Sequence, residues 1–338
     1  MKCFEQLATS SCLSLIGIQT HRWRYRTVLG SPKMIRIMNR RSFLKTSGVA
    51  VAASSLPLPD PTFRVLNNPL RGRIFKSIKI GMFREKLSLE EKFQLLKGMG
   101  YDGVELNSPG GVNKAKALGA SRKVGLPIHG VVDSIHWQTR LSDPDPTVRE
   151  RGLQGLLTAI RDAHTVGGSS VLLVPGRVAN QKKENQQQVW DRSIDQIKKA
   201  LPTAAKLGIH VLIENVWNGF CYTHNGPADQ TADKLAEYLD AIDSPWVGSY
   251  FDIGNHQKYG KPAQWIRTLG KRIVKLDVKD WGKKNGFCKI GDGDVDWAEV
   301  RKALLDIQFT GWCTAEVAGG KRTRIEDVAK RMNVALGL

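Results

Sequence analysis

The run Leu207-Gly208-Ile209-His210-Val211-Leu212-Ile213-Glu214 shows most clearly the unit from which this chain is built. A segment of helical period leads up to it, Gly208 supplies the left-handed residue that ends a helix, and a strand-forming apolar run follows. The same order of helix, glycine and apolar strand recurs around Gly100, Gly125 and Gly167. This repetition predicts βα units that share one parallel sheet.

Outward from this unit, the pattern predicts eight strands and eight helices. The strands are expected at residues 78–83, 103–106, 128–132, 170–174, 210–216, 247–253, 273–278 and 311–317. The helices are expected at residues 89–99, 114–124, 146–166, 185–207, 228–243, 262–269, 297–307 and 325–336, with Ser88, Asp143 and Asp296 as N-terminal caps. Eight βα units in about 260 residues predict an α/β fold, one (β/α)8 TIM barrel. A doubly wound sheet fits less well, because no glycine-rich phosphate loop follows the first strand.

The positive charge of the chain is concentrated near its N-terminus. The 338 residues are 41% hydrophobic and 25% charged, a globular composition, and their formal net charge is +19. Residues 1–76 hold 13 Lys and Arg but 2 Asp and Glu, so they contribute +11 of this charge. The remaining +8 is spread over residues 77–338, in which positive and negative side chains are interspersed. This distribution is typical of a solvated surface and does not indicate a nucleic-acid partner.

Asn39-Arg40-Arg41-Ser42-Phe43-Leu44-Lys45, with the weakly apolar residues 46–58 behind it, resembles a twin-arginine signal peptide. A basic loop before a short helix is the alternative. We expect residues 1–60 to be an extension with this signal (Met34 or Met38 being an alternative start), residues 61–76 a linker, and residues 77–338 a single domain. The twin-arginine translocation machinery is then a partner, and the periplasm or another extracytoplasmic space the destination. No stretch reaches the roughly 20 apolar residues of a membrane span.

Carboxylates stand at the ends of four consecutive predicted strands. They are Glu214, Asp252, Asp277 and Glu316, at the end of the barrel where active sites form. Four anions at one rim repel each other unless a cation neutralises them, so the pattern predicts a divalent metal ion. Oxygen ligands favour Mn²⁺, with Mg²⁺, Co²⁺ or Zn²⁺ as alternatives. For each acid alone, a helix cap or a pair with a lysine is the other interpretation. We also expect Lys279 and Asp280 to pair beside the ligands.

Four short motifs carry a family resemblance. They are Ile-Glu-Asn-Val-Trp-Asn (213–218), Tyr-Phe-Asp-Ile-Gly-Asn-His (250–256), Gly-Asp-Gly-Asp-Val-Asp-Trp (291–297) and Ala-Glu-Val (315–317). Together they resemble the xylose isomerase-like TIM-barrel superfamily over about residues 77–338. This group of sugar phosphate isomerases/epimerases includes hydroxypyruvate isomerases and ketose 3-epimerases, with endonuclease IV as a distant relative.

The resemblance implies metal ligands at Glu214, Asp252 and Glu316, with the two glutamates also acting as acid/base groups. The remaining ligand is a His in the family, and here Asp277 holds its place, which keeps a competent ligand for a hard cation. His256 follows Asp252 by four residues, whereas relatives with a histidine place it three residues on. A surface loop histidine is the other interpretation of His256.

Further residues are expected around the substrate. His129 and His136 are expected to contact substrate hydroxyls, although a core histidine is an alternative for His129. Trp137 and Trp217 are expected to supply an apolar wall against one face of the sugar. Packing in the core is the alternative, and it is the more common role of tryptophan. The expected substrate-binding residues are His129, His136, Trp137, Asn215, Trp217, His256 and Lys279.

The implied activity is a metal-dependent sugar isomerase or epimerase that transfers a proton next to a carbonyl through an enediolate. The partner is a small sugar or sugar-derived substrate, such as a ketose, an aldose or a hydroxypyruvate-type compound, and a homo-oligomer is compatible with the sequence. Two alternatives stay open. One is a metal-dependent hydrolase or lyase on the same barrel, and the other is a non-catalytic, exported sugar-binding protein.

Overall fold

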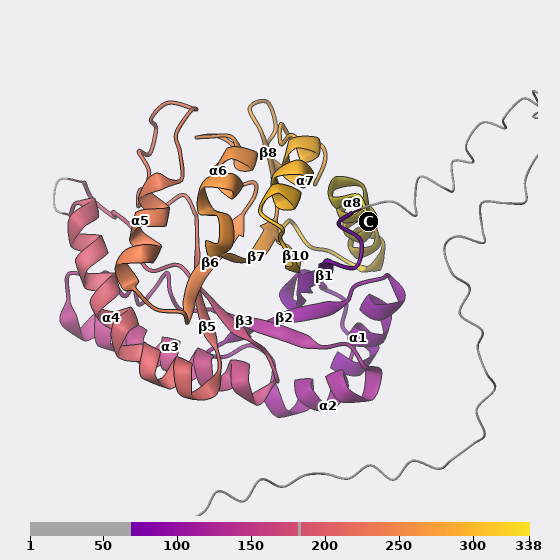
Figure 1. Ribbon diagram of the computed structural model, residues 1–338. Coiled ribbons are helices and arrows are strands. Elements are labelled where there is room, and N and C mark those ends of the chain that lie inside the picture. Colours follow the sequence, from indigo (N-terminus) through magenta and orange to yellow (C-terminus); the bar gives the residue numbers. More distant parts are fainter. Residues whose placement is uncertain (1–68, 182–183) are drawn as a thin grey trace, which may run out of the picture. The chain divides into compact units, whose positions relative to one another are not determined.

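Eight parallel strands close into a barrel that helices surround (Figure 1). The computed structural model describes residues 69–181 and 184–338, so the predicted signal segment lies outside the described residues. The barrel strands are β1 (Ile74–Lys79), β2 (Gly103–Ser108), β3 (Ile128–Asp133), β4 (Ser170–Leu173), β5 (His210–Glu214), β6 (Val247–Asp252), β7 (Ile273–Val278) and β10 (Gly311–Ala315). Successive strands pair in parallel, and β1 pairs with β10 to close the ring. The predicted (β/α)8 barrel is confirmed.

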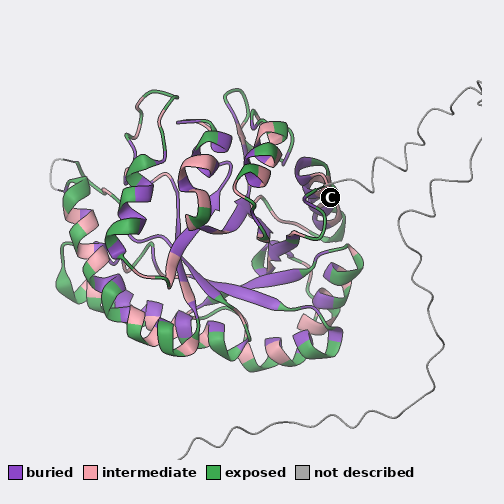
Figure 2. Cartoon of the chain, in the orientation of Figure 1, coloured by how far each residue is buried: buried purple, intermediate pink, exposed green. Residues whose placement is uncertain are grey.

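The helices cover the outside of this barrel. They are α1 (Leu89–Gly98), α2 (Lys114–Val124), α3 (Pro146–Thr165), α4 (Gln186–Leu207), α5 (Asp233–Ile242), α6 (Pro262–Leu269), α7 (Trp297–Asp306) and α8 (Arg322–Leu336), with short 3-10 turns η2 (Ile80–Met82) and η3 (Gly270–Arg272). Figure 2 shows their buried faces turned to the sheet and their exposed faces turned outward. The main apolar core therefore lies between the strands and the helices.

Local capping explains where several helices begin. Ser88 and Glu91 form the predicted capping box at α1, and Asp296 caps α7. The prediction of Asp143 as the cap of α3 is wrong, because Asp145 is the N-cap of this helix. The Asp143 carboxylate instead accepts the Asp145 backbone N–H at 3.0 Å and pairs with Arg140 at 2.8 Å.

The first strand lies earlier in the chain than the pattern predicts. It was expected at residues 78–83, but β1 ends at Lys79 and Ile80, Gly81 and Met82 form the turn η2. Residues 74–78 are paired with β10, beginning with Ile74 beside Gly311. This shift makes Lys79 the last residue of its strand, so that it reaches the end of the barrel where the carboxylates lie.

A short antiparallel hairpin, which the sequence interpretation missed, follows β7. It consists of β8 (Asp280–Gly282) and β9 (Gly286–Cys288). Its turn ends at Asn285, and Gly286, the first residue of β9, adopts a positive φ of 63°. An Asn-Gly pair between two short runs is a usual hairpin signal, so this element was detectable.

Polar side chains occupy part of the barrel interior. Lys275 Nζ lies 3.0 Å from His129 Nδ1 and 2.6 Å from the His129 carbonyl oxygen. His129 Nε2 lies 2.7 Å from Ser77 Oγ, which contacts Thr314. Tyr250 extends this network. Nearly all of these groups are therefore satisfied inside the barrel, as buried polar groups must be.

Among the residues that the structure describes, no helix combines the length and apolar character needed to cross a lipid bilayer.

Candidate active site

Four carboxylates converge at the C-terminal mouth of the barrel. Glu214 and Asp252 are the last residues of β5 and β6, Asp277 is the next-to-last residue of β7, and Glu316 follows β10 directly. Each offers one oxygen atom to a group in which all such oxygens lie within 4.8 Å of one another. Asp252 and Asp277 are fully buried, whereas the Glu316 side chain is 31% exposed. The fold thus brings together the four acids that the sequence singles out.

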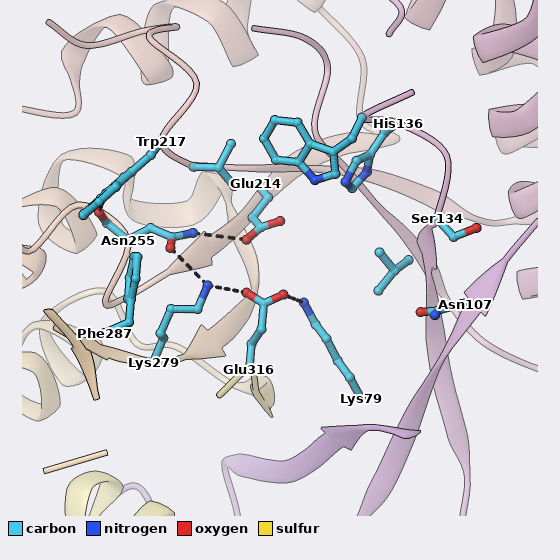
Figure 3. Close-up of a pocket in the computed structure, with 13 residues that line it drawn as sticks. Lys79, Asn107, Ser134, His136, Glu214, Trp217, Asn255, Lys279, Phe287 and Glu316 are labelled. Carbon is cyan, nitrogen blue, oxygen red and sulfur yellow. Dashed lines mark hydrogen bonds and ion pairs between the residues drawn. The ribbon is translucent and has the colours of Figure 1, made fainter. Parts of the chain in front are cut away.

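Two lysine ammonium groups lie between these carboxylates. Lys79 Nζ is 2.9 Å from Asp277 Oδ2 and 2.5 Å from Glu316 Oε1. Lys279 Nζ, directly after β7, is 3.0 Å from Asp252 Oδ2 and 2.6 Å from Glu316 Oε2. Figure 3 shows both lysines reaching the Glu316 carboxylate from opposite sides. Because four carboxylates face two ammonium groups, the ionised cluster has a formal charge of −2.

Burial and mutual repulsion set the pKa values in this cluster. Burial, followed by the charge of Glu316, raises the pKa of Glu214 well above its ordinary value. Burial also raises the pKa of Asp277 well above its ordinary range, although Lys79 opposes this, and it raises the pKa of Asp252 to about 6. Glu316 differs, because Lys79 and Lys279 outweigh the effect of burial and lower its pKa. The cluster therefore contains more carboxylates than its lysines neutralise.

The donor set fits a divalent cation. Asp277 Oδ1 is buried and accepts no hydrogen bond from the described residues, which is a costly state for a carboxylate oxygen. All four candidate ligands are carboxylate oxygens, which suit hard ions such as Mg²⁺ and Mn²⁺. The cluster of Glu214, Asp252, Asp277 and Glu316 could thus hold a metal ion.

Two asparagines position the acids. Asn255 Nδ2 donates to Glu214 Oε1 at 3.3 Å, and Asn255 Oδ1 accepts from Lys279 Nζ at 3.0 Å. Asn215, expected to contact substrate, instead bridges β5 to β6. Its Nδ2 donates to the Asp252 carbonyl oxygen at 2.9 Å, and its Oδ1 accepts from the Asp252 backbone N–H at 2.7 Å. Asn215 therefore fixes Asp252 and does not line the cavity described next.

A cavity of about 470 Å³ opens beside the carboxylates (Figure 3). It is lined by Lys79, Asn107, Val132, Ser134, His136, Trp137, Glu214, Val216, Trp217, Asn255, Lys279, Phe287 and Glu316. A second cavity of about 460 Å³ shares Lys279, Phe287 and Glu316 with the first. Phe287, from the hairpin, thus stands at the boundary between the two. The volume of the first cavity is in the usual range for small-molecule sites.

Three predicted substrate residues form the aromatic side of the cavity. His136 Nδ1 accepts from the Val174 backbone N–H at 3.3 Å. Burial and then the charge of Lys79 lower the pKa of His136 to about 3, so its ring is neutral near pH 7. Trp137 is 39% exposed, and its ring lies edge-on to His136. Trp217 donates from Nε1 to the Asn255 carbonyl oxygen, and its ring centroid is 4.8 Å from that of Phe287.

Two predicted histidines lie away from the cavity. His129 is in the barrel interior, between Ser77 and Lys275, and stacks on Trp312 with ring centroids 4.5 Å apart. His129 is therefore a core histidine and not a substrate contact.

His256 is buried against Trp265. It is thus not a surface loop residue, and it does not belong to the group of candidate metal ligands. Burial lowers its pKa to about 3, so it is neutral at physiological pH.

The expected pair of Lys279 with Asp280 is absent from the described contacts. Lys279 turns to the acids and Asn255, whereas Asp280 accepts from the Gly291 backbone N–H at 2.7 Å and from Trp297 Nε1 at 3.0 Å. Asp280 therefore orders the Gly-Asp-Gly-Asp loop, residues 291–294, which follows the hairpin. The two side chains diverge because the hairpin begins at Asp280, whose carboxylate points toward the loop and away from Lys279.

Sequence reasoning missed five cavity residues with polar or aromatic side chains: Lys79, Asn107, Ser134, Asn255 and Phe287. Lys79 was hidden by the misplaced first strand, and Phe287 by the missed hairpin. Asn107 and Ser134 lie near the ends of β2 and β3, where polar residues after an apolar run were a usable signal.

Comparisons with known proteins bear on the barrel and on the N-terminal segment. Residues 93–334 match the family described as "Xylose isomerase-like TIM barrel", and residues 38–57 match the twin-arginine translocation signal sequence, which indicates export by that route. The L-ribulose-5-phosphate 3-epimerase UlaE of Escherichia coli (strain K12) is 25% identical over 255 residues, which cover 70% of this chain and 86% of that protein. An uncharacterized protein of Methanocaldococcus jannaschii is 26% identical over 176 residues, covering 50% of this chain and only 57% of its own length.

Solved structures share the fold. The IolI protein with a bound zinc atom has a TM-score of 0.65 at 15% identity, covering 78% of this chain and 98% of that one. A structure of L-ribulose 3-epimerase has a TM-score of 0.62 at 16% identity, covering 77% and 94%. The family match covers most of the described barrel. This chain belongs to the xylose isomerase-like TIM barrel family.

Proposed function

We propose that this chain is a metal-dependent sugar epimerase or isomerase that moves a proton on a carbon next to a carbonyl group. The observation that carries the proposal is the placement of Glu214 and Glu316 on one cavity, beside two further acids and two lysines. A sugar epimerase among the relatives supports the same reaction class. The substrate class is a ketose, an aldose or a related hydroxycarbonyl compound.

In this proposal Glu214, Asp252, Asp277 and Glu316 hold the ion, which we propose to be Mn²⁺, with Mg²⁺, Co²⁺ or Zn²⁺ as alternatives. When bound, a divalent cation supplies polarisation of a carbonyl oxygen. The proton transfers are then carried out by residues of the chain. One of the two cavity glutamates removes the proton, and the other returns it to the opposite face or to the neighbouring carbon. The enediolate of the substrate lies between these two transfers.

The cavity walls orient such a substrate. Trp137 and Trp217 offer ring faces to the apolar side of a sugar, and neutral His136 offers a ring nitrogen to a hydroxyl group. Lys279 acts through Asp252 and Glu316, which it holds by ion pairs. We further propose that residues 1–60 carry the export signal and that the enzyme works in the periplasm. The enzyme domain, predicted to begin at residue 77, includes Ile74 to Lys76 of β1, so the proposed linker that starts at residue 61 ends before Ile74.

The test is isotope exchange. Purified protein, loaded with Mn²⁺ and analysed for bound metal, is incubated with a panel of ketoses and aldoses in D₂O. Deuterium entering a substrate carbon next to the carbonyl supports the proposal. Hydrolysis or bond cleavage without exchange supports a hydrolase or lyase instead, and saturable binding without either supports a sugar-binding protein; both outcomes overturn it.

A further inference from the structure

The two lysines of the candidate active site, Lys79 and Lys279, differ in the number of protein acceptor atoms around the ammonium group. Lys279 Nζ has three within 3.0 Å, namely Asp252 Oδ2, Glu316 Oε2 and Asn255 Oδ1. Lys279 Nζ donates a hydrogen bond to Asn255 Oδ1 and forms ion pairs with the two carboxylate oxygens, so three protein acceptors surround an ammonium group that has three N–H bonds. The surroundings of Lys279 Nζ thus offer as many protein acceptors as it has N–H groups.

Lys79 Nζ has only two protein acceptors, Asp277 Oδ2 at 2.9 Å and Glu316 Oε1 at 2.5 Å. No third acceptor is found for it in residues 69–181 and 184–338. Its side chain is 13% exposed and lines the cavity. Figure 3 shows Lys79 extending from β1 to Glu316 at the edge of the open space. One N–H of this buried cation is therefore available to a molecule in the cavity.

The position of this donor is fixed from two sides. Asp277, fully buried on β7, and Glu316, after β10, both grip the ammonium group, so it cannot swing away without leaving a buried carboxylate unpaired. Preorganised donors of this kind stabilise developing negative charge well, because they need no rearrangement during the reaction.

We propose that Lys79 is a catalytic residue that donates a hydrogen bond to the substrate oxygen on which negative charge develops. This inference rests on the proposed function and names a role that the four acids do not fill. As a cavity glutamate takes the proton from carbon, the C–H electron pair forms the new C=C bond and the carbonyl π pair moves to oxygen. Lys79 keeps its proton and donates toward that oxygen. The return of a proton to carbon reverses these shifts, so no further reactant is needed.

The matched variants Lys79→Met and Lys279→Met test this assignment. Binding of sorbitol and D-fructose is measured by calorimetry, and deuterium exchange into D-fructose and into any ketose active in the panel is measured with the same proteins. We expect Lys79→Met to weaken binding about tenfold and to suppress exchange, because a charged hydrogen bond to the ligand is lost. Lys279→Met should lower exchange but keep affinity within about twofold, because its donors all face protein acceptors.

A second measurement does not depend on whether the variants fold. Lysine side chains of the wild-type protein are labelled with ¹⁵N, and the Nζ signals are followed during the same titrations, with Lys79→Arg used for assignment. A shift of the Lys79 signal but not of the Lys279 signal supports the proposal. An unchanged Lys79 signal up to molar sugar, or wild-type affinity in folded Lys79→Met, overturns it. If the wild-type protein shows no deuterium exchange, the proposed function is overturned instead. The calorimetric and ¹⁵N titrations then still decide whether Lys79 contacts the ligand.

Discussion

The ammonium group of Lys79 and the carboxylate of Asp277 join two strands that are not neighbours, with a separation of 2.9 Å between Nζ and Oδ2. Lys79 ends β1, Asp277 lies near the end of β7, and β10 runs between these two strands in the barrel. The Lys79–Asp277 pair therefore reaches across β10 at the C-terminal mouth of the barrel and does not join adjacent strands. It gives a buried aspartate its counter-charge at the place where the family resemblance implies a histidine.

Replacing Glu214 by Gln should abolish isotope exchange while leaving the barrel folded. The amide keeps the size of the side chain and its contact with Asn255, but it cannot take up a proton. We expect a loss of at least about 100-fold in kcat/KM, which is the lower range for a general base. Glu150→Gln, on the exposed surface of α3, is the matched control and should keep wild-type exchange. Full activity in Glu214→Gln would remove this residue from the mechanism.

Metal addition should stabilise the protein through the acidic cluster. Because Mn²⁺ binds the folded state, a concentration about 100 times its Kd should add about 2.7 kcal/mol to the free energy of unfolding. Thermal unfolding with Mn²⁺ and with a chelator measures this effect. Asp252→Asn should lose most of it, whereas Asp195→Asn, an exposed change on α4, should retain it. Equal stabilisation of both variants would place the ion elsewhere.

Asp133 should make stability depend on pH between about 4 and 7. Burial raises its pKa from 3.8 to about 7, although the Ile135 backbone N–H opposes this. Between these values the folded state holds the proton and the unfolded state releases it, so the contribution of Asp133 to stability falls as pH rises. Asp133→Asn should remove this decline and gain up to about 4 kcal/mol relative to wild type at pH 8.

Denaturant unfolding at pH 4 and pH 8 checks the effect of Asp133. The exposed Asp195→Asn variant should follow the wild-type pH dependence. If Asp133→Asn and wild type lose stability in parallel over this range, the burial of a protonated Asp133 is not the cause.

Removing the ring of Phe287 should weaken sugar binding more than it slows proton transfer. Phe287 forms part of both cavities and packs on Trp217, but it carries no titratable group. With Phe287→Ala the two cavities should join, and loss of about 1 kcal/mol of ring contact should raise KM several-fold. Phe75→Ala, which removes an exposed ring beside Trp312, is the control. A large fall in kcat with unchanged KM would contradict this role.

The four acids were predictable because a barrel places strand ends at one rim, so that Glu214, Asp252, Asp277 and Glu316 could be located from their strands alone. Even so, the sequence did not show what neutralises them. Lys79 reaches the cluster only because β1 ends at η2, a backbone detail that the apolar run at residues 78–83 conceals.

The side-chain directions of Asn215, His129 and His256 were equally beyond the sequence. Each belongs to or flanks a strand that was placed correctly, but its neighbours come from other strands and loops. His129 meets Lys275 from β7, and His256 packs on Trp265 from α6. Periodicity reports which residues are buried and not which distant partners receive them.

Asn215 carries one further consequence. By accepting from the N–H of Asp252 and donating to its carbonyl, a side chain beyond the end of β5 reproduces the contacts of one more ladder rung. Together with Asn255, which donates to Glu214 and to the Asn215 carbonyl oxygen, this contact sets the spacing of Glu214 and Asp252 within three residues of the two strand ends. The parts of the following segments that lie beyond Asn215 and Asn255 can therefore change in length and composition without removing these contacts.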